Sequence, residues 1–250
     1  MTAIPPKRTL TPYEQTQLRR YGRADLITAE LDETPVEYLT GKVEFCDLVL
    51  NVSPDVLIPR VETEGLVARA TELCLSRSYT KIAEIGTGCG AIALGLAQTL
   101  AQSQYAATII ASELSQSALN VARTNLEEYP SLKTYVSLQQ GDLLDRYQNQ
   151  SLELIVANLP YIPETILDSL DTSVRLFEPE LALNGGAEGF ELIAALLDQA
   201  PQKLLPGSSV LLEMDYTHNL AMLKPWEQLF EISLFPDYRE VRRFAQLDLR

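Results

Sequence analysis

Between Lys81 and Met214, short apolar runs of strand length alternate with longer segments of helix-forming residues, and this alternation constrains the fold most strongly. The expected strands and helices occupy residues 81–86, 89–101, 107–113, 115–129, 134–142, 152–160, 189–204 and 208–214. Strands that alternate with helices form a mostly parallel sheet with helices on both faces. The sequence therefore predicts a Rossmann-like α/β fold.

The flanking segments complete the expected organisation. Residues 229–238 and 239–249 look like two strands that form an antiparallel hairpin at one edge of the sheet. Partly alternating apolar residues with glycine and proline punctuation predict a β-hairpin linker at residues 34–60. We expect a short, helical and partly disordered segment at residues 1–33, which leaves residues 61–250 for the α/β domain.

The composition argues against several classes of protein. The formal net charge of −14 disfavours electrostatic binding to nucleic acid. No apolar run approaches the length of a membrane span, and the N-terminus lacks the apolar core of a secretory signal. Cys46, Cys74 and Cys89 have no CxxC spacing, and His218 is the single histidine, read as structural. We therefore expect a reduced, cytoplasmic protein without a metal site.

A glycine-rich stretch, "EIGTGCGAIAL", follows an expected strand and opens an expected helix. Gly86, Gly88 and Gly90 stand at alternate positions, where glycine permits unusual backbone angles and lets a ligand approach the main chain closely. The spacing is GxGxG rather than GxGxxG, and the GK[ST] of a P-loop is absent. The stretch indicates a nucleotide-like cofactor, with a tight strand-to-helix turn as the alternative.

Acidic residues follow the next two strands of the domain. Glu113 ends the second strand about 20 residues after the glycines, where a carboxylate can accept hydrogen bonds from both ribose hydroxyls. Asp142 follows the third strand and is expected near the edge of an adenine, with Leu143 packed on the ring. The alternative for Asp142 is an N-cap or a loop carboxylate. With the Asn-x-Pro-Tyr element after the fourth strand, this order indicates S-adenosylmethionine rather than NAD.

The fourth strand runs into Asn158, Leu159, Pro160 and Tyr161, a pattern that resembles the catalytic loop of amino-methyltransferases. An amide or exocyclic amine nitrogen is a weak nucleophile because its lone pair is delocalised. The Asn158 side-chain carbonyl and the Leu159 backbone carbonyl can accept its two hydrogens, which orients the nitrogen and stabilises the positive charge that develops on it. Tyr161 can flank the planar acceptor. A plain loop after a strand is the alternative.

A longer resemblance begins upstream of the glycines. Residues 56–67 read "VLIPRVETEGLV", close to the segment "LIPRPETE" of HemK/PrmC-type protein-(glutamine-N5) methyltransferases, which modify peptide chain release factors. Further matches are "PVEYLTGKVEF", "SELSQSALNVARTNL", "NLPYIP", "EPELALNGGAEGFELI" and "LLPGSSVLLEM". The resemblance covers about residues 34–245. It implies a class I S-adenosylmethionine-dependent methyltransferase domain at residues 61–250, and methylation of the glutamine amide in the Gly-Gly-Gln motif of a release factor.

Position by position, the resemblance also implies a set of site residues. The cofactor, and its product S-adenosylhomocysteine, would contact Gly86, Thr87, Gly88, Cys89, Gly90, Glu113, Asp142, Leu143 and Asn158. The catalytic loop, residues 158–161, would receive the substrate glutamine, with Arg60 as a further substrate contact. The alternative for Arg60 and Glu62 is a structural ion-pair network. Phe45 is expected either to line the cofactor pocket or to belong to the core.

Three features depart from the family pattern. Leu159 stands where the family usually has proline; it keeps the backbone carbonyl and loses the fixed φ angle. Val61 likewise replaces the second proline of the upstream segment. Residues 1–33 have room only for a shortened form of the N-terminal helical domain with which the family grips the release factor.

Two other functions stay open at this point. A methyltransferase of the same fold could act on another amino acceptor, such as a ribosomal-protein glutamine or an adenine N6 of RNA or DNA. The Asn-Leu-Pro-Tyr loop, which also resembles that of ribosomal-RNA adenine dimethyltransferases, motivates this alternative. A cofactor-binding protein without catalysis is the second.

Overall fold

The N-terminal part of the chain is helical. The computed structural model describes residues 8–250, so residues 1–7 of the segment 1–33, which was expected to be partly disordered, lie outside the described part. The elements here are α1 (Pro12–Arg20), the 3-10 helix η1 (Ala24–Thr28) and α2 (Val36–Thr40). Helix α1 begins with a capping box, in which Glu14 donates its N–H to the Thr11 hydroxyl and accepts from the Thr11 N–H at 2.7 Å. Helix α2 lies where only a hairpin was expected, and Gly41, with φ of +69°, ends it.

A two-stranded antiparallel hairpin follows α2. It consists of β1 (Lys42–Phe45) and β2 (Leu48–Asn51). Cys46 and Asp47 at its turn both have positive φ angles, as tight hairpin turns require. The Phe45 side chain is buried and packs against Gly95 of helix α4, where a Cβ atom would stand 3.2 Å from its ring. Phe45 therefore belongs to the core and not to the cofactor pocket.

A seven-stranded sheet forms the centre of the molecule, with the strand order β5-β4-β3-β6-β7-β9-β8. Its strands are β3 (Lys81–Ile85), β4 (Thr108–Glu113), β5 (Val136–Gln140), β6 (Leu152–Ala157), β7 (Leu204–Glu213), β8 (Phe230–Pro236) and β9 (Arg242–Leu249). The strands β3 to β7 are parallel, whereas β8 and β9 form an antiparallel hairpin at one edge. The predicted mostly parallel sheet with an antiparallel edge hairpin is confirmed.

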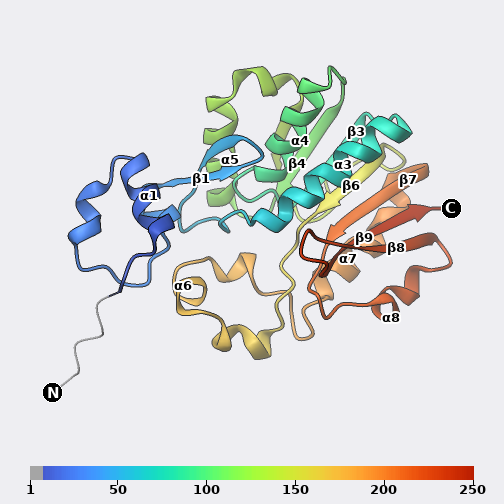
Figure 1. Cartoon of the computed structure of the whole chain (residues 1–250). Coiled ribbons are helices and arrows are strands. Elements are labelled where there is room, and N and C mark those ends of the chain that lie inside the picture. Colours follow the sequence, from blue (N-terminus) through green and yellow to red (C-terminus); the bar gives the residue numbers. More distant parts are fainter. Residues whose placement is uncertain (1–7) are drawn as a thin grey trace.

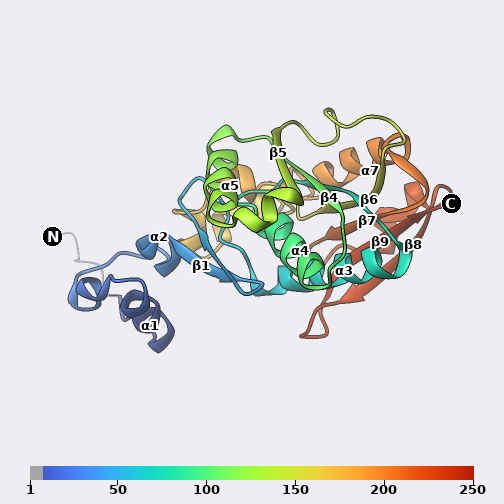
Figure 2. The same ribbon diagram turned by 90° about the horizontal axis from the view of Figure 1, so that it is seen from above.

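Helices cover both faces of the sheet, as predicted. The remaining helical elements are η2 (Val61–Thr63), α3 (Glu64–Arg77), α4 (Ala91–Gln102), α5 (Gln116–Glu128), η3 (Pro130–Thr134), η4 (Glu164–Ser169), α6 (Thr172–Arg175), η5 (Glu180–Ala182), α7 (Glu191–Lys203), α8 (Leu220–Leu223) and η6 (Lys224–Trp226). Figure 2 shows α3, α4 and α5 on one side of the sheet and α7 on the other. Alternate strand residues divide between the two cores, so that Ile82 packs with α3 and α4 while Ala83 packs with α7. Among residues 8–250, no helix has both the length and the apolar character of a membrane span.

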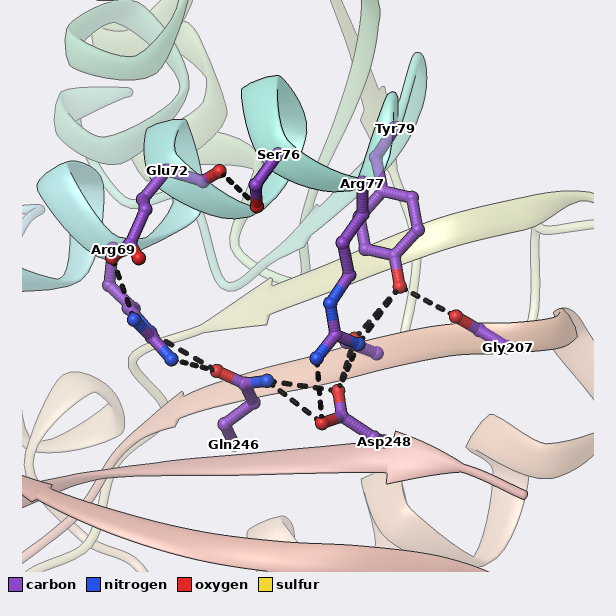
Figure 3. Close-up of polar contacts among 9 residues, drawn as sticks. Arg69, Glu72, Ser76, Arg77, Tyr79, Gly207, Gln246 and Asp248 are labelled. Atoms are coloured by element: carbon purple, nitrogen blue, oxygen red, sulfur yellow. Dashed lines mark hydrogen bonds and ion pairs between the residues drawn. The ribbon is translucent and has the colours of Figure 1, made fainter.

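A polar clamp ties α3 to the antiparallel edge of the sheet (Figure 3). The Arg77 guanidinium donates to both carboxylate oxygens of Asp248, at 2.7 and 3.0 Å. About two turns earlier in α3, Arg69 donates to the Gln246 side-chain oxygen. Gln246 in turn donates to Asp248. The Tyr79 hydroxyl closes the network on the Gly207 carbonyl at 2.6 Å. These contacts fix the helix that immediately follows the "PRVETE" segment.

The loops that leave β3 and β6 lie side by side. In the β3–β6 register Ile85 pairs with Ala157, so Gly86 and Asn158 are the first residues beyond two neighbouring strands. The chain turns outward in opposite directions from these strands, which makes this the topological switch point where parallel sheets bind ligands. The segment that follows β6 carries η4, α6 and η5, and Figure 1 shows α6 lying apart from the sheet.

Candidate active site

A cavity of about 520 Å³ opens at the switch point. This volume is within the range of small-molecule and cofactor pockets. The site residues predicted from the sequence that line it are Arg60, Gly86, Thr87, Gly88, Cys89, Glu113, Asp142, Leu143, Asn158, Leu159 and Pro160. Gly90 and Tyr161 are the two predicted residues that do not line it.

The glycine loop turns sharply at the end of β3 and presents open backbone to the cavity. The Gly86 and Thr87 N–H groups both donate to the Ser112 carbonyl, at 2.9 and 3.0 Å. Gly88 has φ of +56°, and a Cβ atom there would meet nothing within 4 Å. Gly90, with φ of +88°, is the N-cap of α4, so its place is in the turn and not in the cavity wall. A ligand can therefore approach the main chain closely at Gly88.

Glu113 is held in place by two main-chain N–H groups. Its Oε2 accepts from the Gly88 N–H at 2.8 Å and its Oε1 from the Ser115 N–H at 2.9 Å. Two hydrogen bonds leave further lone pairs on the carboxylate, which can accept from the hydroxyls of a bound ribose. Asp142 and Leu143 lie in a turn beside it, with the Asp142 N–H on the Asp145 carboxylate at 3.1 Å.

Glu84 is a buried acid that supports the glycine loop, and the sequence analysis did not single it out. Glu84, one residue before the end of β3, accepts a hydrogen bond of 2.6 Å from the Thr87 hydroxyl. Burial raises the pKa of Glu84 to about 8. Its second oxygen, Oε1, has no hydrogen-bond partner within residues 8–250. The sequence signal that could have identified Glu84 is the presence of an acidic residue inside the apolar run "KIAEI".

The β1–β2 hairpin is anchored to the glycine loop through one asparagine. Asn125 of α5 is fully buried and donates to the Cys89 carbonyl at 2.8 Å and to the Asn51 carbonyl at 3.0 Å. Its side-chain oxygen accepts from the Asn51 N–H at 2.7 Å. Burial raises the pKa of the Cys89 thiol to about 12, so this cysteine stays neutral. The loop and the hairpin are thus positioned as one unit.

The loop that begins at Asn158 is braced by residues 183–189. Ile162 donates to the Leu183 carbonyl at 3.0 Å, and Gly185 donates back to the Ile162 carbonyl at 2.9 Å. A Cβ atom on Gly185 would stand 2.7 Å from the Pro160 carbonyl oxygen. Only glycine fits there, which gives the tract "LNGGAEG" a physical role.

Leu159 fills the place of the proline that the family usually has. Its side chain is buried, and its Cδ2 atom stands 3.2 Å from where a Cβ atom of Gly86 would be. The leucine thus packs directly on the glycine loop. Tyr161 is half-buried against the core on the α7 side of the sheet, and burial raises the pKa of its hydroxyl to about 12.

The upstream segment forms ion pairs at the edge of the cavity. Arg60 Nη2 lies 2.5 Å from Glu178 Oε1, and the Glu178 side chain is 1% exposed. Glu178 also accepts from the Ile58 N–H at 3.3 Å. Glu62 pairs with Arg239 at 3.2 Å. Arg60 and Glu62 both form ion pairs, as the alternative reading of these two residues expected. Arg60 also lines the cavity.

Sequence reasoning missed part of the cavity wall. Further lining residues include Pro54, Asp55, Val56, Leu57, Thr63, Ser115, Ser117, Pro179, Leu181, Asn184, Gly185 and Gly186. Most of them lie in the stretches "VLIPRVETEGLV" and "EPELALNGGAEGFELI". These stretches indicated the family resemblance, but they did not indicate which of these residues line a cavity. His218 is buried against Phe190, away from this wall. Within residues 8–250 no group of three or more metal-ligating side chains is present.

Comparisons with known proteins agree with this geometry. Residues 63–178 match the family model of the methyltransferase small domain. A release factor glutamine methyltransferase of Moorella thermoacetica is 44% identical over 181 residues, which are 72% of this chain and 62% of that protein. A protein of the same description from Koribacter versatilis is 32% identical over 239 residues, 95% of this chain and 81% of that protein.

Several of these relatives are longer than this chain. The chain spans about three fifths of the length of the relatives from Gloeobacter violaceus and Moorella thermoacetica, with 61% and 62% covered. A crystal structure of a methyltransferase from Pyrococcus furiosus aligns with a TM-score of 0.54 at 15% identity, over 96% of this chain and 98% of that one. Together with the sheet order, this likeness assigns the class I methyltransferase fold.

Proposed function

This chain belongs to the release factor glutamine methyltransferase family, and on that premise we propose that it methylates the side-chain amide of a glutamine in a peptide chain release factor. The acceptor would be the glutamine of the Gly-Gly-Gln motif, and the methyl donor S-adenosylmethionine. One observation carries the proposal: the β3–β6 register brings the glycine loop and Asn158 together in a single cavity.

The cavity wall fits the proposed cofactor. S-adenosylmethionine, when bound, supplies an electrophilic methyl group on a sulfonium centre. The open backbone at Gly88 would lie against its amino-acid part, and the Glu113 carboxylate would accept from its ribose hydroxyls. Leu143 lines the same cavity on the side expected for the adenine.

The loop after β6 would hold the methyl acceptor. The Asn158 carbonyl can accept one hydrogen of the glutamine amide, and the Leu159 backbone carbonyl can accept the other. Both interactions strengthen as positive charge develops on the nitrogen, so they favour the transition state over the ground state. A strong base is not required, because the nitrogen becomes acidic only after methyl transfer. The bracing by residues 183–189 keeps the two acceptors in a fixed geometry.

A direct test compares methyl transfer by the wild-type protein and by Asn158→Ala. We expect transfer from labelled S-adenosylmethionine to purified release factor, reduced about 100-fold or more in the variant. Asn149→Ala is the matched control, since Asn149 is exposed on a loop outside the cavity wall, and it should keep wild-type rates.

Calorimetry of S-adenosylmethionine binding separates the remaining outcomes. Binding without transfer to any protein would favour the non-catalytic alternative. Label on RNA and none on the release factor would replace the glutamine with an adenine acceptor and contradict the proposal.

A further inference from the structure

Three polar residues from distant parts of the chain meet behind the catalytic loop. The Asn158 Nδ2 atom lies 3.2 Å from the Thr63 hydroxyl, and Thr63 is 95 positions earlier in the chain. In the β6–β7 register Ala157 pairs with Leu212, so Asn158 and Glu213 are again neighbours at adjacent strand ends. Thr63 and Glu213 are both buried. The Glu213 Oε2 atom has no hydrogen-bond partner anywhere in the described chain.

The chemistry of these groups favours one orientation of the Asn158 amide. An asparagine amide has a donor end and an acceptor end, and only its partners decide which end points where. An ionised carboxylate can only accept, and hydrogen bonding from Thr63 and from Asn158 favours the ionised form of Glu213. The single hydroxyl proton of Thr63 is therefore best used when it points toward Glu213. The lone pairs of Thr63 are then free to accept from the Asn158 NH₂ group. The Asn158 carbonyl must face the other way, into the cavity.

We infer that Thr63 and Glu213 are positioning residues that orient the Asn158 amide with its carbonyl toward the methyl acceptor. The inference rests on the proposed function, because it gives that carbonyl a substrate amide to receive. It also explains why a polar residue is needed at Thr63 and an acid at the end of β7, inside an otherwise apolar environment.

The orientation depends on the charge of Glu213. Once protonated, Glu213 can donate to Thr63, and the Thr63 proton then turns toward Asn158 and favours the opposite amide orientation. Burial raises the pKa of Glu213 to about 7, whereas Thr63, Arg243 and Asn158 favour the ionised form and Glu62 opposes it. Further charged or titratable groups near this site include Tyr161, which stays neutral, and Asp215 beside it. Asp237 pairs with Arg243 at 3.0 Å, and Arg239 pairs with Glu62 at 3.2 Å. Transfer should therefore rise with pH through about 7.

Thr63→Val tests the hydroxyl. We expect kcat for methyl transfer to fall about tenfold, while KM for S-adenosylmethionine changes by less than about twofold. Thr63→Ser, which restores the hydroxyl, should recover most of the rate. Thr71→Val is the control, because the Thr71 hydroxyl is also hydrogen-bonded, to Thr99 at 2.8 Å, on a half-buried side chain that lies outside the cavity wall. An unchanged kcat in Thr63→Val would overturn the inference.

Glu213→Gln tests the charge. In this variant the rise of kcat with pH near 7 should flatten, because the neutral amide can donate as well as accept. Burial raises the pKa of Glu84 to about 8, so any part of the pH dependence that belongs to Glu84 will persist in the variant. A pH profile identical to that of the wild type would show that Glu213 does not set the orientation.

A spectroscopic readout keeps this inference separate from the proposed function. In ¹⁵N-labelled protein, the Asn158 NH₂ signal can be assigned by its absence from Asn158→Asp. We expect slow hydrogen exchange of this signal in the wild type and faster exchange in Thr63→Val. That difference would support the orientation even if no release factor were methylated. Equal exchange in the two proteins would refute it even if transfer were observed.

Discussion

Gly185 and Gly88 show that two glycines of one cavity can be required for different reasons. A side chain at Gly185 would collide with the backbone of the catalytic loop, 2.7 Å from the Pro160 carbonyl oxygen and 2.7 Å from the Tyr161 Cα atom. Gly88, by contrast, has nothing within 4 Å of its Cβ position and faces the cavity. The first glycine shapes the protein, and the second leaves room for a ligand.

We predict that Gly185→Ala displaces residues 160–161 and lowers kcat for methyl transfer at least about tenfold. Because backbone atoms cannot rotate away, the loop itself must move. Gly207→Ala is a suitable control: Gly207 has φ of +79°, so alanine is strained there by about 1 kcal/mol, but the site lies far from the cavity wall. Steady-state kinetics on folded protein should show a loss only for the first variant. Equal activity of both variants would mean that the brace is not needed.

Some residues of the candidate site could be predicted from the sequence, and others could not. Asn158 and Glu113 stand at the carboxyl ends of expected strands, so their arrival at one sheet edge follows from the parallel topology alone. Thr63 and Glu213 reach Asn158 only through tertiary packing across 95 residues in one case and a strand register in the other. Neither the long-range contact nor the strand register produces a periodic pattern in the sequence.

Among the elements, the link between α3 and the sheet edge depends on a partly buried ion pair. Burial opposes ionisation of Asp248, but hydrogen bonds from Arg77, Ser209 and Gln246 prevail and lower its pKa below the usual 3.8. A carboxyl whose pKa is lower in the folded state stabilises the protein above its unfolded pKa. This contribution is lost as the pH falls through the still lower folded value.

We predict that Asp248→Asn lowers the free energy of unfolding by about 1–2 kcal/mol at pH 7, because it leaves the Arg77 guanidinium without its charged partner. The difference between variant and wild type should shrink as the pH falls below 3.8 and should be lost below the lower folded pKa, where the wild-type carboxyl is neutral in the folded protein as well. Urea unfolding at several pH values measures both effects. Glu72→Gln, which removes an exposed ion pair with Arg69, should change stability by less than about 0.5 kcal/mol. A pH-independent difference for Asp248→Asn would rule out this electrostatic origin.

The larger elements were predictable because burial imposes a period on them. The five parallel strands and the helices α3, α4, α5 and α7 carry apolar runs that match their geometry. Helix α2 and the short helices between β6 and α7 carry no such period, because they are shorter than two turns or packed irregularly. Their backbone is set by proline and glycine positions and by contacts with the loops that they cover.

For the whole molecule, the net charge argues against nucleic acid as a partner, and the sheet topology places the binding site. A net charge of −14 disfavours a phosphate backbone, and the cavity opens at the switch point of the sheet. The sequence predicted this edge as the site, since the glycine stretch, the acidic residues and the catalytic loop all follow or end expected parallel strands. The depth of the cavity and the wall contributed by residues 179–186 required the folded chain.

The central claim is that this cavity delivers a methyl group to a glutamine amide, and one measurement tests it most directly. Wild-type protein is incubated with S-adenosylmethionine, a purified release factor and total RNA, and the products are mapped by tandem mass spectrometry. We predict one added methyl group on the side-chain nitrogen of the glutamine in Gly-Gly-Gln, and none on a release factor with glutamate at that position. Methylation of an adenine, or of the release factor at any other residue, would contradict the account.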